Sequence, residues 1–264
     1  VYASLVEFLD TRGLLRTPPF DSTPCAGAGL RAISAAKVRE FLRLAEERGR
    51  FHPSGARSPK DVLTHFHLLA DGVPTQAAVF LFGRSPVRWL TQTPIHCLWF
   101  AGTEKRKPID DQKAFAGTAF EIIDAALQFV LDKLTSRVGL ATAGAGAPVQ
   151  PEIPVFAIRE AIVNAVAHRD YLSAGFGQCI VFSDRVEVWN PGHLPAGLTA
   201  EDLRTPHGPV PHNPLIAEPL FRAGYAEKAG TGTTDIIEAC RAAGLPEPEF
   251  AQRGPHFVVT LWRD

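Results

Sequence analysis

The sequence predicts a mixed α/β protein whose last part, residues 151–264, forms a ligand-binding domain. Three observations predict it. A helix with one apolar face runs from Pro154 to about His168, and two short apolar segments, Cys179–Phe182 and Val186–Trp189, then form a hairpin. The third is a glycine-rich turn at 230–233, which opens another helix and is followed by a closing strand, Phe257–Leu261.

Composition indicates a globular protein. Apolar residues make up 45% of the 264 residues, and no apolar run approaches the roughly 20 residues that span a bilayer. Asp10, Arg12 and Arg16 interrupt the start, so it does not resemble a signal peptide, and no membrane partner is expected. The cysteines form no CxxC pair, which predicts free buried thiols in a reducing cytoplasm. They are Cys25, Cys97, Cys179 and Cys240.

Charge argues against DNA binding by this chain itself. The 27 basic and 28 acidic residues leave a net charge of −1, whereas a domain that binds DNA phosphates usually has a basic excess. A sequence that opens at Val1 and contains no methionine is expected to be a segment of a longer protein. Any DNA-binding surface is therefore expected upstream. The sequence leaves open one alternative, in which residues 30–135 themselves bind nucleic acid.

The part before residue 151 is predicted to be helix-rich. Residues 1–30 are interpreted as the tail of an upstream domain, 31–140 as a mixed α/β linking module, and 141–150 as a linker rich in Ala and Gly. The expected elements of the module are a helix capped by Ser34, a helix after Pro59, strands Ala77–Phe82 and Ile95–Phe100, and a helix from Phe120 to Leu134.

Two further patterns in this module are interpreted without a ligand. The charged stretch Glu104–Lys107 is expected to be a solvated turn. His65 and His67 lie two positions apart, so on a helix they point to different sides and cannot hold a metal together.

Polar residues on the Pro154–His168 helix could address a ligand. Glu160, Asn164 and His168 follow one another at i, i+4 and i+8, and are separate from the apolar stripe. Taken alone, this pattern is more typical of a solvated outer face than of a site. The turn Gly230-Thr231-Gly232-Thr233 adds a second signal, because backbone amides at a glycine-rich helix start bind anions and glycine lets a phosphate approach closely.

The order of these motifs resembles the GHKL ATPase superfamily, whose site is built from an N-box, a G1 box and a G2 box around a lid. The stretches "REAIVNAVAHRDY", "DRVEVWNPGHLP", "NPLIAEPLFRAGYAEKAGTG" and "ACRAAGLPEPEF" are similar to the divergent GHKL domain of bacterial transcriptional regulators often named RecG-related. Those proteins carry a Schlafen/AlbA-type DNA-binding domain upstream. The resemblance is strong over 153–250 and weaker over 20–140, and it implies a two-layer α/β (α+β) sandwich of Bergerat type after the module.

The resemblance also implies roles. Glu160 would orient or deprotonate the attacking water, and Asn164 would coordinate Mg²⁺. Residues 194–229 would be the lid. The nucleotide-binding residues would be Asn164, His168, Asn190, Gly192, Gly230, Thr231, Gly232 and Thr233.

The G1 box departs from the family pattern. Asn190 stands where the family has the Asp that accepts the adenine amino group, and Leu194 replaces the second glycine. An amide oxygen still accepts a hydrogen bond, but without a charge.

The resulting hypothesis is an ATP- and Mg²⁺-binding domain of a DNA-binding transcriptional regulator that acts through lid closure, with weak ATPase activity or none. The alternative is a degenerate GHKL fold that serves as a ligand-free interaction or dimerisation module, and the sequence leaves a homodimer open. No G-x-x-x-x-G-K-[ST] motif is present, which excludes a P-loop helicase. A kinase catalytic loop would need Asn where Gly175 stands, which excludes a protein kinase.

Overall fold

The computed structural model describes residues 19–52, 58–134, 136–137, 150–195, 197–206, 208, 211–226 and 231–263. Gly230, most of the proposed 141–150 linker and the proposed tail up to residue 18 lie outside these ranges. The α/β fold class is confirmed, since helices pack against a six-stranded mixed sheet.

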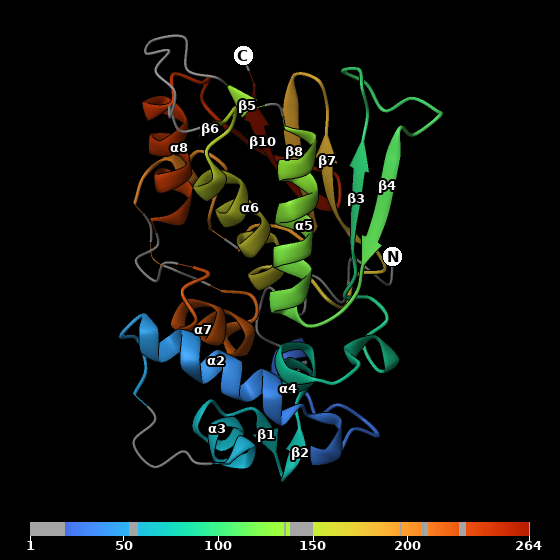
Figure 1. Cartoon of the computed structure of the whole chain (residues 1–264), viewed down its shortest axis with the longest axis vertical. Coiled ribbons are helices and arrows are strands. Elements are labelled where there is room, and N and C mark those ends of the chain that lie inside the picture. Colours follow the sequence, from blue (N-terminus) through green and yellow to red (C-terminus); the bar gives the residue numbers. More distant parts are fainter. Residues whose placement is uncertain are drawn as a thin grey trace, which may run out of the picture.

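The main sheet has the order β4-β3-β7-β8-β10-β9 (Figure 1). Strands β3 and β7 are parallel, and the other neighbouring pairs are antiparallel. Two-stranded sheets are formed by β1 with β2 and by β5 with β6. The strands are β1 (Leu69–Ala70), β2 (Val73–Pro74), β3 (Ile95–Trp99), β4 (Asp111–Phe115), β5 (Ser136–Arg137), β6 (Gln150–Pro151), β7 (Gly177–Val181), β8 (Arg185–Pro191), β9 (Glu249–Arg253) and β10 (His256–Trp262).

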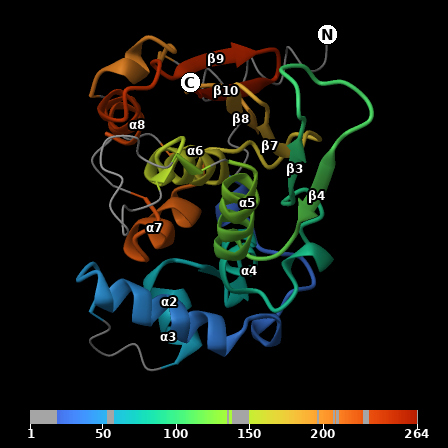
Figure 2. The same ribbon diagram turned by 45° about the horizontal axis from the view of Figure 1, so that its top comes forward.

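One layer of helices covers a single face of this sheet. Helix α6 contacts β8 and β10, α5 contacts β3 and β7, and α6 lies between α5 and α8 (Figure 2). Helices α2, α3 and α4 lie at one end of this layer, with α7 next to α2 (Figure 1). The α-helices are α2 (Ala35–Glu47), α3 (Pro59–His65), α4 (Gln76–Phe82), α5 (Ala119–Lys133), α6 (Val155–Ala167), α7 (Pro214–Arg222) and α8 (Gly232–Ala242), and the short 3-10 turns are η1 (Phe20–Ser22), η2 (Leu30–Ala32), η3 (Pro86–Arg88) and η4 (Asp202–Arg204).

Most helices begin where the sequence predicts. The Ser34 side chain accepts a hydrogen bond from Lys37 N at the start of α2, and Ser58 forms a capping box with Asp61 at the start of α3. Thr118 and Glu121 form a second capping box at the start of α5. These caps satisfy amides that no helical carbonyl reaches, which fixes the first turn of each helix.

Helix α4 corrects the sequence-based expectation of a strand at Ala77–Phe82. All six residues are fully buried, and the Thr75 side chain accepts a hydrogen bond from Ala78 N as the helix cap. A short apolar run that is buried on every side shows neither helical nor strand periodicity, so the sequence pattern could not distinguish the two structures. Two strands of the main sheet, β4 and β9, were not expected, and both lie at its edges. The short strands β1, β2, β5 and β6 were not expected either.

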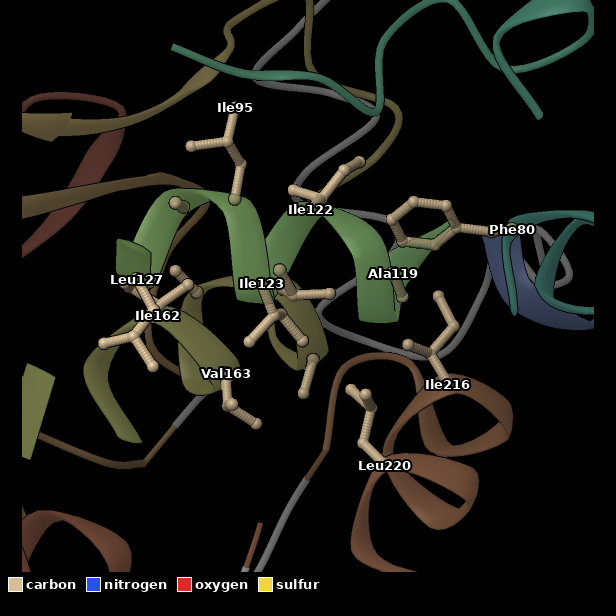
Figure 3. Close-up of a cluster of buried hydrophobic side chains, with 14 of the residues drawn as sticks. Phe80, Ile95, Ala119, Ile122, Ile123, Leu127, Ile162, Val163, Ile216 and Leu220 are labelled. Atoms are coloured by element: carbon tan, nitrogen blue, oxygen red, sulfur yellow. The ribbon is translucent and has the colours of Figure 1, made fainter. Parts of the chain in front are cut away.

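The core passes without a break from the preceding module into the C-terminal part. Ile122 and Ile123 of α5 lie near Ile162 of α6, and Phe80 of α4 and Ile216 of α7 approach from the neighbouring elements (Figure 3). The sheet is shared in the same way, because β3 of the module pairs with β7 of the C-terminal part.

This parallel pairing brings two cysteines together that are distant in the sequence. Cys97 of β3 lies opposite Cys179 of β7, and both are buried. All four cysteines are free thiols, as expected.

A loop at 101–110 lies against the sheet face that carries no helices. Ser183 N donates to Gly102 O, and the Arg185 guanidinium donates to Thr103 O. Lys105 Nζ lies 3.9 Å from the centre of the Trp189 ring. The stretch Glu104–Lys107 is exposed, in agreement with a solvated turn.

Among the helices of the described ranges, none has both the length and the apolar character needed to cross a membrane.

Candidate functional site

A cavity of about 680 Å³ lies between α6, the start of α8 and strands β8 and β10. Helix α6 and the residue that ends it contribute a carboxylate, an amide and an imidazole. The residues that the sequence singled out and that line this cavity are Glu160, Asn164, His168, Asn190, Gly192, Gly232 and Thr233. Elements far apart in the chain therefore contribute to one concave site.

Helix α6 positions Glu160 and Asn164 together. Their i, i+4 spacing places them one turn apart, and Asn164 Nδ2 donates a hydrogen bond to Glu160 Oε1 at 3.2 Å. Glu160 is only 3% exposed. Because Nδ2 is directed to Glu160, the remaining polar atom of the amide, Oδ1, is an acceptor suited to a hard cation. His168 caps the helix, donating its backbone N–H to Asn164 O.

The start of α8 packs directly against Glu160. A Cβ atom at Gly232 would overlap Glu160 Oε1, so any larger residue at this position would require the Glu160 carboxylate to shift. Thr233 Oγ1 is buried and has no hydrogen-bond partner. Thr231 precedes the helix, and its hydroxyl donates to Asp235 Oδ2 at 2.8 Å; it is not among the described lining residues. The G2-box positions therefore divide into two that face the cavity and one that does not.

Strands β8 and β10 form an apolar floor with one buried amide. Val188 pairs with Val259, and Asn190 pairs with Phe257 across the two strands. All four side chains line the cavity. Asn190 is 7% exposed, and its Oδ1 has no hydrogen-bond partner.

Gly192 follows β8, and its backbone conformation and close neighbours favour glycine. Its φ is +135°, and an added Cβ would lie 3.3 Å from Asp170 N. Asp170 N in turn donates to Pro191 O at 2.9 Å, which fixes the turn out of the strand against the end of α6. The G1-box glycine thus brings the chain close to His168 and Asp170.

The segment expected to be a lid, 194–229, has two different parts where the structure describes it. Leu194, Leu198 and Leu203 line the cavity ahead of α7. Helix α7 itself is anchored, with Ile216 and Leu220 fully buried. A movement of α7 itself would therefore expose these two side chains, whereas the described residues ahead of α7 border the cavity.

Asn213 fixes the boundary between these two parts. Its Nδ2 donates to Ala167 O at 3.0 Å and to Arg169 O at 2.8 Å, which ties the start of α7 to the end of α6.

Several lining residues were not found by sequence reasoning. His65 and His67 of the preceding module reach the same cavity, as do Glu218 and Arg222 of α7. His67 has a φ of +55°, which is unusual for a residue other than glycine. No local signal marks these residues, because only the packing of the module against α7 brings them to the cavity.

The cavity fits a phosphate ligand better than a metal centre held by protein side chains alone. Within the described ranges, no group of three or more His, Cys, Asp or Glu side chains is arranged to hold a metal ion. A single amide beside a carboxylate is instead typical of Mg²⁺ sites in which phosphates and water supply most ligands.

Comparison with known proteins agrees with this geometry. Residues 178–261 match the family model described as "Putative ATP-dependent DNA helicase recG C-terminal". Among solved structures, the DIP2311 protein from Corynebacterium diphtheriae superposes with a TM-score of 0.70 at 22% sequence identity, over 97% of this chain and 48% of that chain. The chain thus spans about half the length of that protein, and the likeness concerns the fold. No curated protein matches the sequence. The C-terminal part of this chain is therefore similar to a RecG-related, GHKL-like ATPase domain.

Proposed function

We propose that the cavity binds ATP together with Mg²⁺, and that binding regulates a longer DNA-binding protein of which this chain is part. The main support is that Glu160 and Asn164 of α6 line the same cavity as Gly232 and Thr233 of α8. Backbone amides at a helix start suit phosphate oxygens. The similarity of residues 178–261 to an ATPase-like family supports the same ligand.

The buried polar atoms of the cavity also support a ligand. Asn190 Oδ1 and Thr233 Oγ1 lack partners, and a buried group left unsatisfied costs about 1–3 kcal/mol. A nucleotide that donates to the amide oxygen and accepts from the hydroxyl would remove both costs. In this proposal Asn164 Oδ1 contributes to holding Mg²⁺, and Glu160 orients the attacking water.

Regulation would act through the part of the lid before α7. Leu194, Leu198 and Leu203 would close over bound nucleotide while α7 stays anchored by Asn213 and by its buried face. Closure would change how an upstream DNA-binding domain is presented. Adenine would be bound less tightly than by an Asp, since Asn190 provides no charge at the base end of the site.

Thermal unfolding with and without Mg-ATP tests this proposal, using the parent chain, Asn164→Ala and Gly232→Val. At a nucleotide concentration 100 times Kd, binding stabilises the folded state by about 2.7 kcal/mol. We expect a rise of several degrees in the parent that both variants lose. Gly102→Ala is the matched control, because its Cβ would meet nothing within 4 Å, and it should keep the full shift.

The second candidate is a ligand-free interaction module with a degenerate GHKL fold. The observation that favours it is Leu194, which stands at a glycine position of the G1 box and lines the cavity. The absence of any nucleotide-dependent shift in the parent, together with no heat on titration with high micromolar Mg-ATP, would reject ATP binding and support this alternative.

A further inference from the structure

We propose that the cavity accepts 6-oxopurine nucleotides as well as 6-aminopurine nucleotides, because Asn190 meets the purine edge with an amide that the protein does not hold in one orientation. This inference rests on the proposed function and specifies its ligand class.

In this proposal the base lies at the β8–β10 floor. Phosphates belong at the other side, where the start of α8 meets Glu160 and Asn164. The floor is made of Val188, Val259 and Phe257, whose apolar surfaces suit the flat faces of a purine. Asn190 is the buried polar side chain among them. It is therefore the group on this floor that can read the edge of the base.

An amide can pair with either type of purine edge. Adenine presents a 6-amino donor beside the N1 acceptor, and a side-chain amide offers the complementary acceptor and donor. Hypoxanthine presents the reverse pattern, a 6-oxo acceptor beside an N1–H donor. Rotation of the amide by half a turn exchanges Oδ1 and Nδ2 and matches this second pattern equally well.

The surroundings of Asn190 leave that rotation open. Oδ1 has no hydrogen-bond partner, and the cross-strand neighbour is the ring of Phe257, which cannot fix a donor or an acceptor. Asn213 provides a contrast, since both of its amide contacts are to carbonyl oxygens, which fixes Nδ2 as the donor.

Carboxylates that line the cavity are engaged elsewhere. Among the described lining residues these are Glu160, whose Oε1 accepts a hydrogen bond from Asn164 Nδ2, and Glu218, whose Oε1 lies 2.7 Å from Arg222 Nε. A carboxylate would act only as an acceptor and would repel a 6-oxo group, whereas an amide does not.

Calorimetric titration of the full chain with three Mg-nucleotides tests the inference. ATP and inosine triphosphate differ only at the 6-position and N1, and purine riboside triphosphate carries no group at position 6. We expect the Kd values for ATP and inosine triphosphate to agree within about threefold, and purine riboside triphosphate to bind roughly tenfold more weakly, as for one lost hydrogen bond of a buried group.

Two variants assign the effect to Asn190. Asn190→Leu should lower the affinity for ATP and inosine triphosphate at least to that of the parent for purine riboside triphosphate. Asn190→Asp should separate the two, lowering the affinity for inosine triphosphate at least tenfold more than that for ATP. Circular dichroism without nucleotide establishes that each variant is folded.

The outcomes distinguish this inference from the proposed function. If the parent binds ATP at least tenfold more tightly than inosine triphosphate, the amide has a fixed orientation and the inference is wrong, while ATP binding stands. Equal affinity for all three nucleotides means that no group reads the 6-position, which also overturns it. If none of the three binds, the proposed function and the inference fail together. The parent titrations decide the matter even where a variant does not fold.

Discussion

Gly232 lies against the carboxylate of Glu160 so closely that a Cβ atom at position 232 would overlap Glu160 Oε1. The contact joins the first residue of α8 to the middle of α6, and it places the two polar elements of the candidate site at contact distance. The order of the two helix motifs in the sequence suggested that they form one site. The packing of α8 against α6 brings them into contact.

The first prediction concerns this contact. Replacing a helical glycine by alanine ordinarily stabilises a protein by about 0.5–1 kcal/mol. We expect Gly232→Ala to destabilise the protein by about 1–3 kcal/mol instead, because the methyl group must displace a buried carboxylate or the start of α8. Urea denaturation measures the difference, with Gly102→Ala as the control, expected within about 0.5 kcal/mol of the parent.

A double-mutant cycle identifies the cause. Glu160→Ala should relieve the overlap, so the loss in Glu160→Ala/Gly232→Ala should be smaller than the sum of the single losses. Strictly additive losses would mean that Gly232 is needed for another reason.

The second prediction concerns Asp21, which caps α7 from 194 residues away in the chain. Its Oδ2 accepts a hydrogen bond from Leu215 N at 2.7 Å, and its Oδ1 is buried without a partner. We expect Asp21→Ala to cost about 1–3 kcal/mol, because it leaves the Leu215 N–H unsatisfied. Asp21→Asn keeps an acceptor, so it should retain most of the stability that Asp21→Ala loses.

The pH dependence of Asp21 has a defined sign. Burial raises the pKa of the Asp21 carboxyl above its usual value, although the N–H of Leu215 opposes the rise. The folded state therefore holds its proton more tightly than the unfolded state, and the buried charge lowers stability above the folded-state pKa.

Relative to Asp21→Asn, the parent should gain stability as the pH falls through the folded-state pKa toward that of an ordinary aspartate. Parallel denaturation curves of the two proteins at a series of pH values measure this difference. A parent that instead loses stability relative to Asp21→Asn on acidification would show that the carboxylate is favoured by folding.

The third prediction concerns Arg169, a buried guanidinium bound by carbonyl oxygens. It donates to the carbonyls of Gln92, Thr93, Pro94 and Gly175, and burial lowers the pKa of the guanidinium. These bonds join the loop before β3 to the loop before β7, where the two strands pair in parallel.

Lysine cannot reproduce the fork of donors, so we expect Arg169→Lys to reduce the free energy of unfolding by about 2–4 kcal/mol. The exposed Arg106→Lys should change it by less than about 0.5 kcal/mol. Equal effects of the two substitutions in urea denaturation would show that the carbonyl contacts of Arg169 add nothing.

The fourth prediction concerns thiol reactivity. All four cysteines are buried, and burial raises the pKa of Cys240 to about 11. The hydrogen bond between Cys97 and Cys179, together with burial, raises the pKa of the Cys97 thiol. Since the thiolate is the reactive form, a disulfide reagent at pH 8 should modify no cysteine in the native protein and all four after unfolding. Rapid reaction of any thiol under native conditions would contradict this packing.

Local patterns in the sequence determined the elements that carry the site. The helical spacing of Glu160 and Asn164, the hairpin that ends at Asn190 and the helix that opens at Gly232 were all expected, because side-chain period, turn residues and glycine act over a few residues. The roles that the resemblance implies for these residues remain predictions.

Tertiary structure alone decided what surrounds them. Ala77–Phe82 is a helix that its sequence pattern could not reveal, because every residue of the run is buried. His65 and His67 line the cavity because the module packs beside α7. The strands of the module entered the same sheet through the parallel pairing of Ile95–Trp99 with Gly177–Val181. Such contacts join residues far apart in the chain, and their free energy depends on burial and shape complementarity, which no short stretch of sequence specifies.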